Sequence, residues 1–402
     1  VVVTRAIDLL PQPKKSLLAA VTKVLGKRPR LPSKGIVSFN DMLVTKSAYP
    51  LHTPGYGDIT ALQYTGGTTG VSKGVMLTQG SLMSNVAQTM AMVSVGGRSV
   101  KHFTTVSPLP LYHIYAFTVS LVMSDMGHEM VLIPNPRDIP GFVKELSKHK
   151  FSSFAGLNTL FVALCNNKEF NALDFSHLKH TISGGMALTE AAASTWQNVT
   201  GCQIQEAYGL TETSPAVSFN PYRDIRIGTI GKVVTGTQVK VISEDGTDLG
   251  FDQEGELCVK GPQVMAGYWQ RPEATAQVMD ADGWFKTGDV AILAEDGFIR
   301  LVDRIKDMIN VSGFNVYPNE IDDIASQHSG ILECAAVGIP NSVSGETVKL
   351  FVVKSDPNLT ADDVISHCRE HLTAYKVPKE VEFRDDLPKT NVGKILRRAL
   401  RD

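Results

Sequence analysis

A loop of glycine and hydroxyl residues, which ends in one lysine, follows the apolar run Ile59 to Tyr64. Its residues are Thr65, Gly66, Gly67, Thr68, Thr69, Gly70, Val71, Ser72 and Lys73. Glycines let backbone N–H groups come close to an anion, the hydroxyls donate hydrogen bonds, and Lys73 adds a mobile positive charge. The loop departs from the Walker A pattern because Ser72, rather than glycine, precedes Lys73. This composition predicts a phosphate-binding loop, with a flexible solvated turn as the alternative.

Four further polar strings lie downstream of this loop. They are Tyr208-Gly209-Leu210-Thr211-Glu212-Thr213, Lys286-Thr287-Gly288-Asp289, Asp303-Arg304-Ile305-Lys306-Asp307 and Pro388-Lys389-Thr390-Asn391-Val392-Gly393-Lys394. Taken in order with the glycine loop, these motifs resemble those of the adenylate-forming superfamily of acyl-CoA synthetases, peptide-synthetase adenylation domains and luciferases. The resemblance covers the chain from about Ile36 to Asp402.

Within the superfamily, the chain looks most like the bacterial long-chain fatty acyl-CoA synthetases. Four stretches carry this likeness: Pro110 to Ile114, Asn135 to Gly141, Gly261 to Met265 and Ser312 to Pro318. The likeness implies that a fatty acid and MgATP give acyl-AMP and pyrophosphate, and that coenzyme A then displaces AMP. The alternatives are a fatty acyl-AMP ligase that loads a carrier protein, an aryl or medium-chain acid–CoA ligase, and a non-catalytic chain that binds nucleotide or acyl groups.

Adenylation must bring a carboxylate to the α-phosphate of ATP, although both groups are negatively charged and repel each other. The resemblance implies that Lys73 and its loop hold the outer phosphates and that Thr211 donates to the α-phosphate. Glu212 is the candidate Mg²⁺ ligand, since this hard ion prefers carboxylate oxygen. A Thr-Glu pair alone would more often cap a helix. Lys394 would lie over the forming adenylate and stabilise its negative charge.

Nucleoside recognition is assigned to a second group of residues. Gly184, Gly185 and Met186 follow the apolar run Thr181–Ser183, and Tyr208 offers a ring that can stack on adenine. Asp289 is the candidate for the ribose, because a carboxylate can accept hydrogen bonds from both vicinal hydroxyls. Gly209 and Arg304 complete the candidate set, and a plain Gly-Asp turn is the alternative for Asp289.

A change of orientation between two domains is implied by the resemblance, with Lys306 as the hinge. After rotation, Ser312, Gly313 and Phe314 would approach the thiol of coenzyme A, with Gly313 leaving room for the chain to pass. Some relatives carry lysine at the position of Asn310, so the polar partner for thiolation is unassigned. For the acyl pocket the candidates are His113, which could also be a core histidine, and Phe117, at the place of an aromatic gate.

The elements that must position these residues predict an α/β protein. Strands are expected at Phe103–Val106, Met130–Ile133, Phe151–Ala155, His180–Ser183 and Ile204–Tyr208, and helices at Ser81–Val93, Ile139–Lys148 and Leu188–Val199. Such alternation favours mostly parallel, helix-covered sheets. We expect a large domain over 1–305, with a β-rich subdomain at about 228–300, and a small mobile α+β domain over 306–402. That last domain contains predicted strands at Leu332–Ile339 and Val348–Val353 and a helix at Ala361–Leu372.

Composition excludes several other classes of protein. The 402 residues carry a net charge of −2, which gives no global attraction to nucleic acid. Five scattered cysteines suggest neither a disulfide framework nor a zinc site, so a cytoplasmic protein is expected. The chain opens on Val1 without a signal peptide, and the family carries more sequence upstream, so we expect an N-terminally incomplete large domain.

One basic segment points to a membrane surface. Between Leu9 and Asn40 the chain has no acidic residue, and its cations are Lys14, Lys15, Lys23, Lys27, Arg28, Arg30 and Lys34. Leu17, Leu18, Val21 and Leu25 recur there at helical spacing, so the segment could lie on anionic lipid at the inner face of the cell membrane. A helix packed on its own domain is the alternative. Homodimer formation is left open.

Overall fold

The computed structural model describes residues 2–5, 7–26, 35–44, 52–65, 72–94 and 103–401 and forms two units, residues 1–53 and 54–402. In the first unit, β1 (Val2–Val3) pairs in parallel with β2 (Val37–Ser38). Two helices accompany these strands, α1 (Lys14–Val24) and α2 (Phe39–Val44). Helix α1 confirms the predicted helical spacing, while Lys27, Arg28, Arg30 and Lys34 lie outside the described residues.

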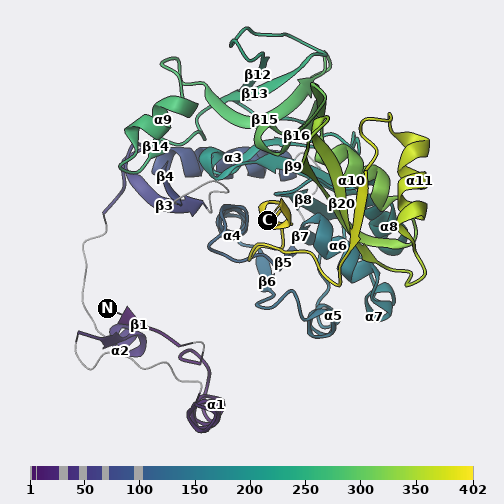
Figure 1. Cartoon of the computed structure of the whole chain (residues 1–402). Helices are drawn as coiled ribbons and strands as arrows, with labels where there is room; N and C mark the ends of the chain where they lie inside the picture. Colours follow the sequence, from purple (N-terminus) through teal and green to yellow (C-terminus); the bar gives the residue numbers. More distant parts are fainter. Residues whose placement is uncertain are drawn as a thin grey trace. The chain divides into compact units, whose positions relative to one another are not determined.

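A seven-stranded sheet in the order β11-β10-β9-β8-β7-β5-β6 forms the centre of the second unit (Figure 1). Its strands are β5 (Thr104–Ser107), β6 (Glu129–Leu132), β7 (Ser153–Gly156), β8 (His180–Gly184), β9 (Ile204–Gly209), β10 (Ala216–Phe219) and β11 (Lys232–Val233). Strands β5 to β9 pair in parallel, and β10 and β11 join by antiparallel pairing. The parallel strands therefore bring their carboxyl ends, including Gly184 and Gly209, to one edge of the sheet.

Helices cover both faces of this sheet. They are α3 (Gln79–Ser94), α4 (Ile114–Asp125), α5 (Ile139–Leu146), α6 (Asn158–Cys165), α7 (Lys168–Asn171) and α8 (Glu190–Thr200). On β5, Val106 belongs to the core cluster formed with α5 to α8, whereas the hydroxyl of the preceding Thr105 donates to Met123 Sδ of α4 at 3.1 Å. Successive strand residues point to opposite faces, so Met123, near the end of α4, lies on the face opposite α5 to α8, whereas Ala116, near its start, belongs to the α5–α8 cluster.

The core on the α5–α8 face is aromatic. Phe154 of β7 packs beside Trp196 of α8, with ring centroids 5.2 Å apart, and Phe161 of α6 lies 4.8 Å from the same indole. All three side chains are fully buried. Helix α8 begins at Glu190 because Thr189 caps it, accepting from the N–H of Ala192 at 3.3 Å.

Two smaller sheets stand beside the central one. The first has the order β14-β4-β3, with β3 (Ile59–Thr65), β4 (Lys73–Thr78) and β14 (Gly267–Tyr268), and α9 (Pro272–Val278) follows it. The second is antiparallel and comprises β12 (Gln238–Ile242), β13 (Glu254–Lys260), β15 (Phe285–Leu293) and β16 (Ile299–Arg304). This second sheet is the β-rich part that the sequence predicts. Two 3₁₀ turns, η1 (Thr211–Thr213) and η2 (Ile305–Asp307), follow β9 and β16.

The C-terminal part has its own five-stranded sheet and core. Its elements are β17 (Ile309–Val311), β18 (Phe314–Val316), α10 (Pro318–Ser326), β19 (Ile331–Asn341), β20 (Gly345–Lys354), α11 (Ala361–His371), β21 (Glu380–Phe383) and α12 (Arg398–Arg401). Buried Ile321 of α10 and Val364 of α11 pack on the β19–β20 pair in one hydrophobic cluster. The α/β fold class is confirmed, whereas the domain boundaries at 305 and 306 stay predictions.

Candidate active site

The phosphate end of the site is built on the β3–β4 hairpin. Thr65 pairs with Lys73 in the register of these strands, so the two ends of the glycine loop are joined. Residues 66–71, including the predicted Gly66, Gly67, Thr68, Thr69 and Gly70, lie outside the described residues. The ammonium of Lys73 lies 4.7 Å from the centroid of the Tyr268 ring. The favourable cation–π contact fixes the lysine over a buried aromatic face.

Glu212 lies beside the same tyrosine. The Tyr268 hydroxyl donates to Glu212 Oε1 at 2.8 Å, and the Glu212 carbonyl accepts from the N–H of Met265, also at 2.8 Å. Thr211, half-buried, begins the η1 turn that carries Glu212. Gly209 ends β9 where a Cβ would lie 1.9 Å from the carbonyl oxygen of Pro215, so no larger residue fits. Lys73 and Glu212, 139 positions apart in sequence, are thus brought to one ring.

The magnesium prediction is compatible with this donor set. Among the residues that the structure describes, no group of three or more His, Cys, Asp and Glu side chains could hold a metal ion. Mg²⁺ is usually held by one or two carboxylates together with substrate phosphates and waters, so a protein cage is not required. Glu212 supplies one such carboxylate, next to the hairpin that carries the predicted phosphate loop.

The nucleoside candidates form a second cluster. Asp289 is 1% exposed; its Oδ2 accepts from the Tyr208 hydroxyl at 2.5 Å and its Oδ1 lies 3.1 Å from Arg304 Nε. The register of β15 and β16 pairs Asp289 with Arg304, and Tyr208 lies on β9. Each carboxylate oxygen has a second lone pair, so these contacts leave acceptor capacity for a ribose. Burial, and then Asp289, raises the pKa of Tyr208 well above 10, so its hydroxyl stays protonated.

Lys394 lies at the carboxyl end of β8. A Cβ built on Gly185 would be 3.2 Å from Cε and 3.5 Å from Nζ of Lys394. Gly184 ends the strand, and a Cβ there would lie 3.3 Å from the Tyr115 ring. Met186, the third member of the predicted set, packs on the α5–α8 core. The structure therefore brings the C-terminal lysine to the glycine pair that was assigned to adenine.

Several polar contacts join the C-terminal part to the large part of the second unit, and three of them involve α6, α8 and the segment before α5. The Thr159 hydroxyl donates to the carbonyl of Gly393 at 3.0 Å, next to Lys394. Arg137 donates to the carbonyl of Thr390 at 3.4 Å. The N–H of Glu190, at the start of α8, donates to Asp323 of α10 at 3.0 Å.

The charge of Lys394 is sensitive to these surroundings. Lys394 is half-buried, and this burial, followed by the nearby Arg304, lowers the pKa of Lys394 to about 8. Burial also lowers the pKa of His113 to about 4, with Lys394 as the second cause. His113 is therefore a neutral imidazole at pH 7. It caps helix α4 and accepts from the N–H of Tyr115 at 3.4 Å.

The remaining predicted residues lie in two further places. Phe117 of α4 is half-buried and packs on a cluster that contains Ile114 and Tyr268. Lys306 lies in the η2 turn, where burial and Arg304 lower its pKa.

The coenzyme A candidates occupy the β17–β18 hairpin. Ser312 and Gly313 both have positive φ, at 54° and 85°. Phe314 is 56% exposed and stacks on Tyr375 with ring centroids 4.8 Å apart. In the described part of the chain, the N–H groups of Ser312 and Gly313 donate to the Ser344 carbonyl and to Asn310, and neither bond reaches the large sheet.

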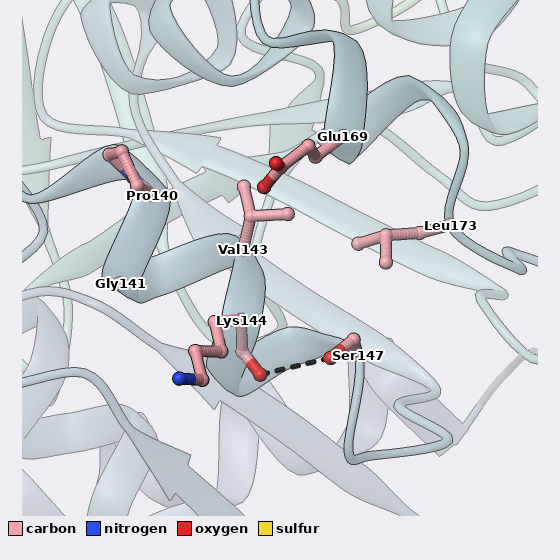
Figure 2. Close-up of a pocket in the computed structure, with 7 residues that line it drawn as sticks. All are labelled: Pro140, Gly141, Val143, Lys144, Ser147, Glu169 and Leu173. Atoms are coloured by element: carbon pink, nitrogen blue, oxygen red, sulfur yellow. Dashed lines mark hydrogen bonds between the residues drawn. The ribbon is translucent and has the colours of Figure 1, made fainter.

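Two hollows border the described second unit. One of about 560 Å³ lies where β5 and β6 end and includes Arg137, Tyr112 and Asn391 of the turn that precedes Lys394. The other, of about 430 Å³, lies between α5 and α7 (Figure 2). Neither lining contains a predicted site residue, and the first hollow reaches the turn that precedes Lys394 through Asn391.

Two residues near the site escaped prediction from the sequence. Tyr268 belongs to a two-residue strand with no chemical signature, and Thr159 is an ordinary helix residue. Their positions depend on pairings and docking contacts between segments far apart in the chain.

Comparisons with known proteins identify the family. Residues 2–269 match the family model described as AMP-binding enzyme, and residues 320–394 match the AMP-binding enzyme C-terminal domain. A long-chain-fatty-acid–CoA ligase of Salmonella typhimurium is 51% identical over 407 residues, which cover 100% of this chain and 72% of the relative.

Solved structures show the same architecture. ATP-bound MatB from Rhodopseudomonas palustris superposes with a TM-score of 0.82 at 30% identity, covering 97% of this chain and 77% of MatB. The apo form of MatB gives a TM-score of 0.71 at 29% identity, over the same shares. From the fold, the site and these matches we conclude that the chain belongs to the family of AMP-binding enzymes.

Proposed function

We propose that the protein is an ATP-dependent long-chain fatty acid–CoA ligase. In the first half-reaction a fatty acid carboxylate attacks the α-phosphate of ATP, giving acyl-AMP and pyrophosphate. In the second, the thiol of coenzyme A attacks the acyl carbon, AMP leaves, and the thiol proton is released. The observation that carries the proposal is Lys394 beside Gly185, where the charge of Arg304 also lowers the pKa of the lysine. The 51% identical relative, named a long-chain-fatty-acid–CoA ligase, supports the substrate class.

During adenylation, side chains of this chain would supply positive charge and hydrogen-bond donors at the oxygens where negative charge develops. Lys73 would hold the outer phosphates, Thr211 would donate to the α-phosphate, and Lys394 would stabilise the oxygens of the carboxylate and α-phosphate as they approach. Tyr208 and Asp289 would hold the nucleoside. Bound Mg²⁺, held by Glu212 and the phosphates, would neutralise charge on the triphosphate.

The orientation of the C-terminal part supports an assignment to the adenylation half-reaction. Thr159 holds the carbonyl next to Lys394, and the chain superposes better on ATP-bound than on apo MatB. For thiolation, the C-terminal part would rotate about Lys306 and bring Ser312 to Phe314 toward the acyl group. The acyl chain would enter along His113 and Phe117.

Peripheral contact with an anionic membrane is a further proposal. Leu17 and Leu25 on helix α1 and its C-cap are 66% and 60% exposed, and Lys14, Lys15 and Lys23 lie in the same segment. Apolar side chains with flanking cations suit an anionic lipid surface. No helix among the described residues is long and apolar enough to cross a membrane. Homodimer formation stays a prediction.

The deciding experiment separates the two half-reactions. The chain would be supplied with MgATP, coenzyme A and fatty or aromatic acids of increasing size, and acyl-AMP and acyl-CoA would be detected by mass spectrometry. We expect both products with long-chain acids. Lys394→Ala should abolish most acyl-AMP formation while largely sparing thiolation of supplied acyl-AMP. A matched variant, Lys389→Ala, removes a lysine of the same turn that pairs instead with Glu333. Equal loss of both half-reactions in Lys394→Ala would contradict the two-orientation proposal.

A further inference from the structure

Tyr268 is held in place by its backbone on both sides. Strand β14 pairs with β4 so that Tyr268 stands opposite Val75, and the N–H of Trp269 donates to the Gly74 carbonyl at 2.7 Å. The N–H of Tyr268 itself donates to the Thr275 hydroxyl at 2.9 Å. The ring therefore has a fixed position relative to the strand that begins with Lys73.

Its side chain joins two groups of opposite charge. The edge carries the hydroxyl, which donates to Glu212 Oε1 at 2.8 Å, while the Lys73 ammonium lies 4.7 Å from the ring centroid. Lysine has a long, flexible stem, and a carboxylate on a short turn can rotate, so each group loses freedom through contact with the ring. Only 6% of Tyr268 is exposed, so water competes little for either contact.

The hydrogen bond also orients the carboxylate. With Oε1 engaged by the Tyr268 hydroxyl, the direction of Oε2 is set by the same bond.

We propose that Tyr268 is a positioning residue that sets the Glu212 carboxylate and the Lys73 ammonium at one fixed separation, so that the metal and the outer phosphates bind as a unit. The inference rests on the proposed function, in which these two groups face MgATP. It adds a residue from outside the glycine loop and the Thr211-Glu212 string to the phosphate end of the site.

The alternative is that Tyr268 only fills the core. It belongs to a buried cluster with Leu77 and Phe285, so removing the whole ring would destabilise the fold for that reason alone. Tyr268→Phe keeps the ring and the cation–π contact and removes only the donor. A purely structural role predicts that this variant loses some stability but binds metal and nucleotide like the parent.

Binding is measured directly, without relying on turnover. Mn²⁺, as a probe for Mg²⁺, would be titrated by electron paramagnetic resonance in the presence of a non-hydrolysable ATP analogue. We expect Tyr268→Phe to weaken Mn²⁺ binding about three- to tenfold, with little change in metal-free nucleotide binding. Tyr268→Leu, which also removes the face under Lys73, should weaken the metal-free nucleotide as well. Thermal unfolding of each variant reports its stability.

A second tyrosine provides the matched control. Tyr317 is also buried and donates to a glutamate, Glu254, on β13. Tyr317→Phe removes the same kind of bond outside the phosphate end, and its Mn²⁺ binding should equal that of the parent. Parental Mn²⁺ binding in Tyr268→Phe, or equal weakening in both variants, would overturn the proposal. Failure of the parent to form acyl-AMP would contradict the proposed function instead, while the binding titration would still test Tyr268.

Discussion

The ammonium-bearing end of Lys394 lies against the backbone of Gly185: a methyl group placed on this glycine would be 3.2 Å from Cε and 3.5 Å from Nζ of the lysine. A side chain at this position would push the end of Lys394 away by a few tenths of an ångström. Gly185 also has φ of +92°, a conformation that residues with a Cβ rarely adopt. The glycine therefore contributes both its backbone conformation and the space for Lys394.

Gly185→Ala should reduce acyl-AMP formation by more than its loss of folding stability alone would explain. The added methyl would displace Lys394, and the positive φ would add strain of about 1–3 kcal/mol. Pyrophosphate exchange measures adenylation, and thermal unfolding measures the strain. Gly201→Ala is the control, since Gly201 has φ of +72° but nothing within 4 Å of a built Cβ. The control should lose stability and keep adenylation, and an equal effect of both variants on adenylation would contradict the role of the Gly185–Lys394 contact.

Adenylation should fall as the pH rises above about 8. The pKa of Lys394 is lowered to about 8 by burial and by Arg304, so the charged form predominates below this value and is lost above it. A rate of acyl-AMP formation measured from pH 6 to 10 should therefore decline with an apparent pKa near 8. Thiolation of supplied acyl-AMP should lack this decline, because Lys394 would leave the site in the proposed rotation.

Lys394→Arg tests whether the decline belongs to this lysine. Arginine stays charged throughout that range, so any residual adenylation in the variant should not decline near pH 8. A decline that persists unchanged in Lys394→Arg would assign the titration to another group.

Much of the fold follows from the sequence, because short apolar runs and amphipathic segments alternate. The strand predicted at His180–Ser183 lies at His180–Gly184, and the helix predicted at Leu188–Val199 lies at Glu190–Thr200. The helix begins later than predicted because Thr189 serves as its cap, which apolar spacing does not reveal.

The site was less predictable, for a physical reason. Residue types predicted the phosphate loop, but the contact of Lys394 with Gly185 depends on how the C-terminal part docks. The resemblance placed Lys394 over the forming adenylate and did not anticipate this contact. Tyr268 was missed because its importance comes from the β14–β4 pairing, which brings a ring from one segment to charges from two others.

Asp289→Ala should weaken ATP binding and also lower stability. Loss of a charge-assisted partner for the nucleoside should cost about 1.5–3 kcal/mol, or roughly a tenfold to hundredfold change in affinity. The variant also leaves the buried Tyr208 hydroxyl without its acceptor, which costs about 1–3 kcal/mol of folding free energy. Isothermal titration with ATP and thermal unfolding measure the two effects.

The control for Asp289→Ala is Asp296→Ala. Asp296 lies at the periphery of the same β-rich sheet and forms an exposed ion pair with Arg226, which the change removes. That change should leave ATP binding intact. If Asp289→Ala changes the preference for acyl chain length but keeps the parental affinity for ATP, the assignment of Asp289 to the nucleoside is wrong.

The basic segment should bind anionic vesicles with a strength that falls as salt rises, because exposed charges are screened beyond about 8 Å at physiological ionic strength. Co-sedimentation with phosphatidylserine vesicles would measure it. Neutralising Lys23, Lys27 and Arg28, of which the last two lie outside the described residues, should reduce binding without affecting adenylation of a soluble short acid. Neutralising Lys168, Lys179 and Lys354 is the matched control. Salt-independent binding, or no binding, would contradict the membrane proposal and leave the segment as an ordinary surface helix.

Phe117→Ala should relax the selection of chain length while leaving ATP turnover intact. The half-buried ring packs beside Ile114 and Tyr268, and a flexible acyl chain would have to displace it. Each buried CH₂ contributes roughly 0.8 kcal/mol, so the parent should favour each longer acid by up to about fourfold until the pocket is filled. The enlarged variant should show a flatter series of kcat/KM values. Phe251→Ala, at a ring that is 54% exposed, serves as the control. If the parent prefers acetate or an aromatic acid, the long-chain assignment is wrong, although the roles proposed for Lys73, Glu212 and Lys394 in adenylation would stand, because they act on ATP and the carboxylate rather than on the chain.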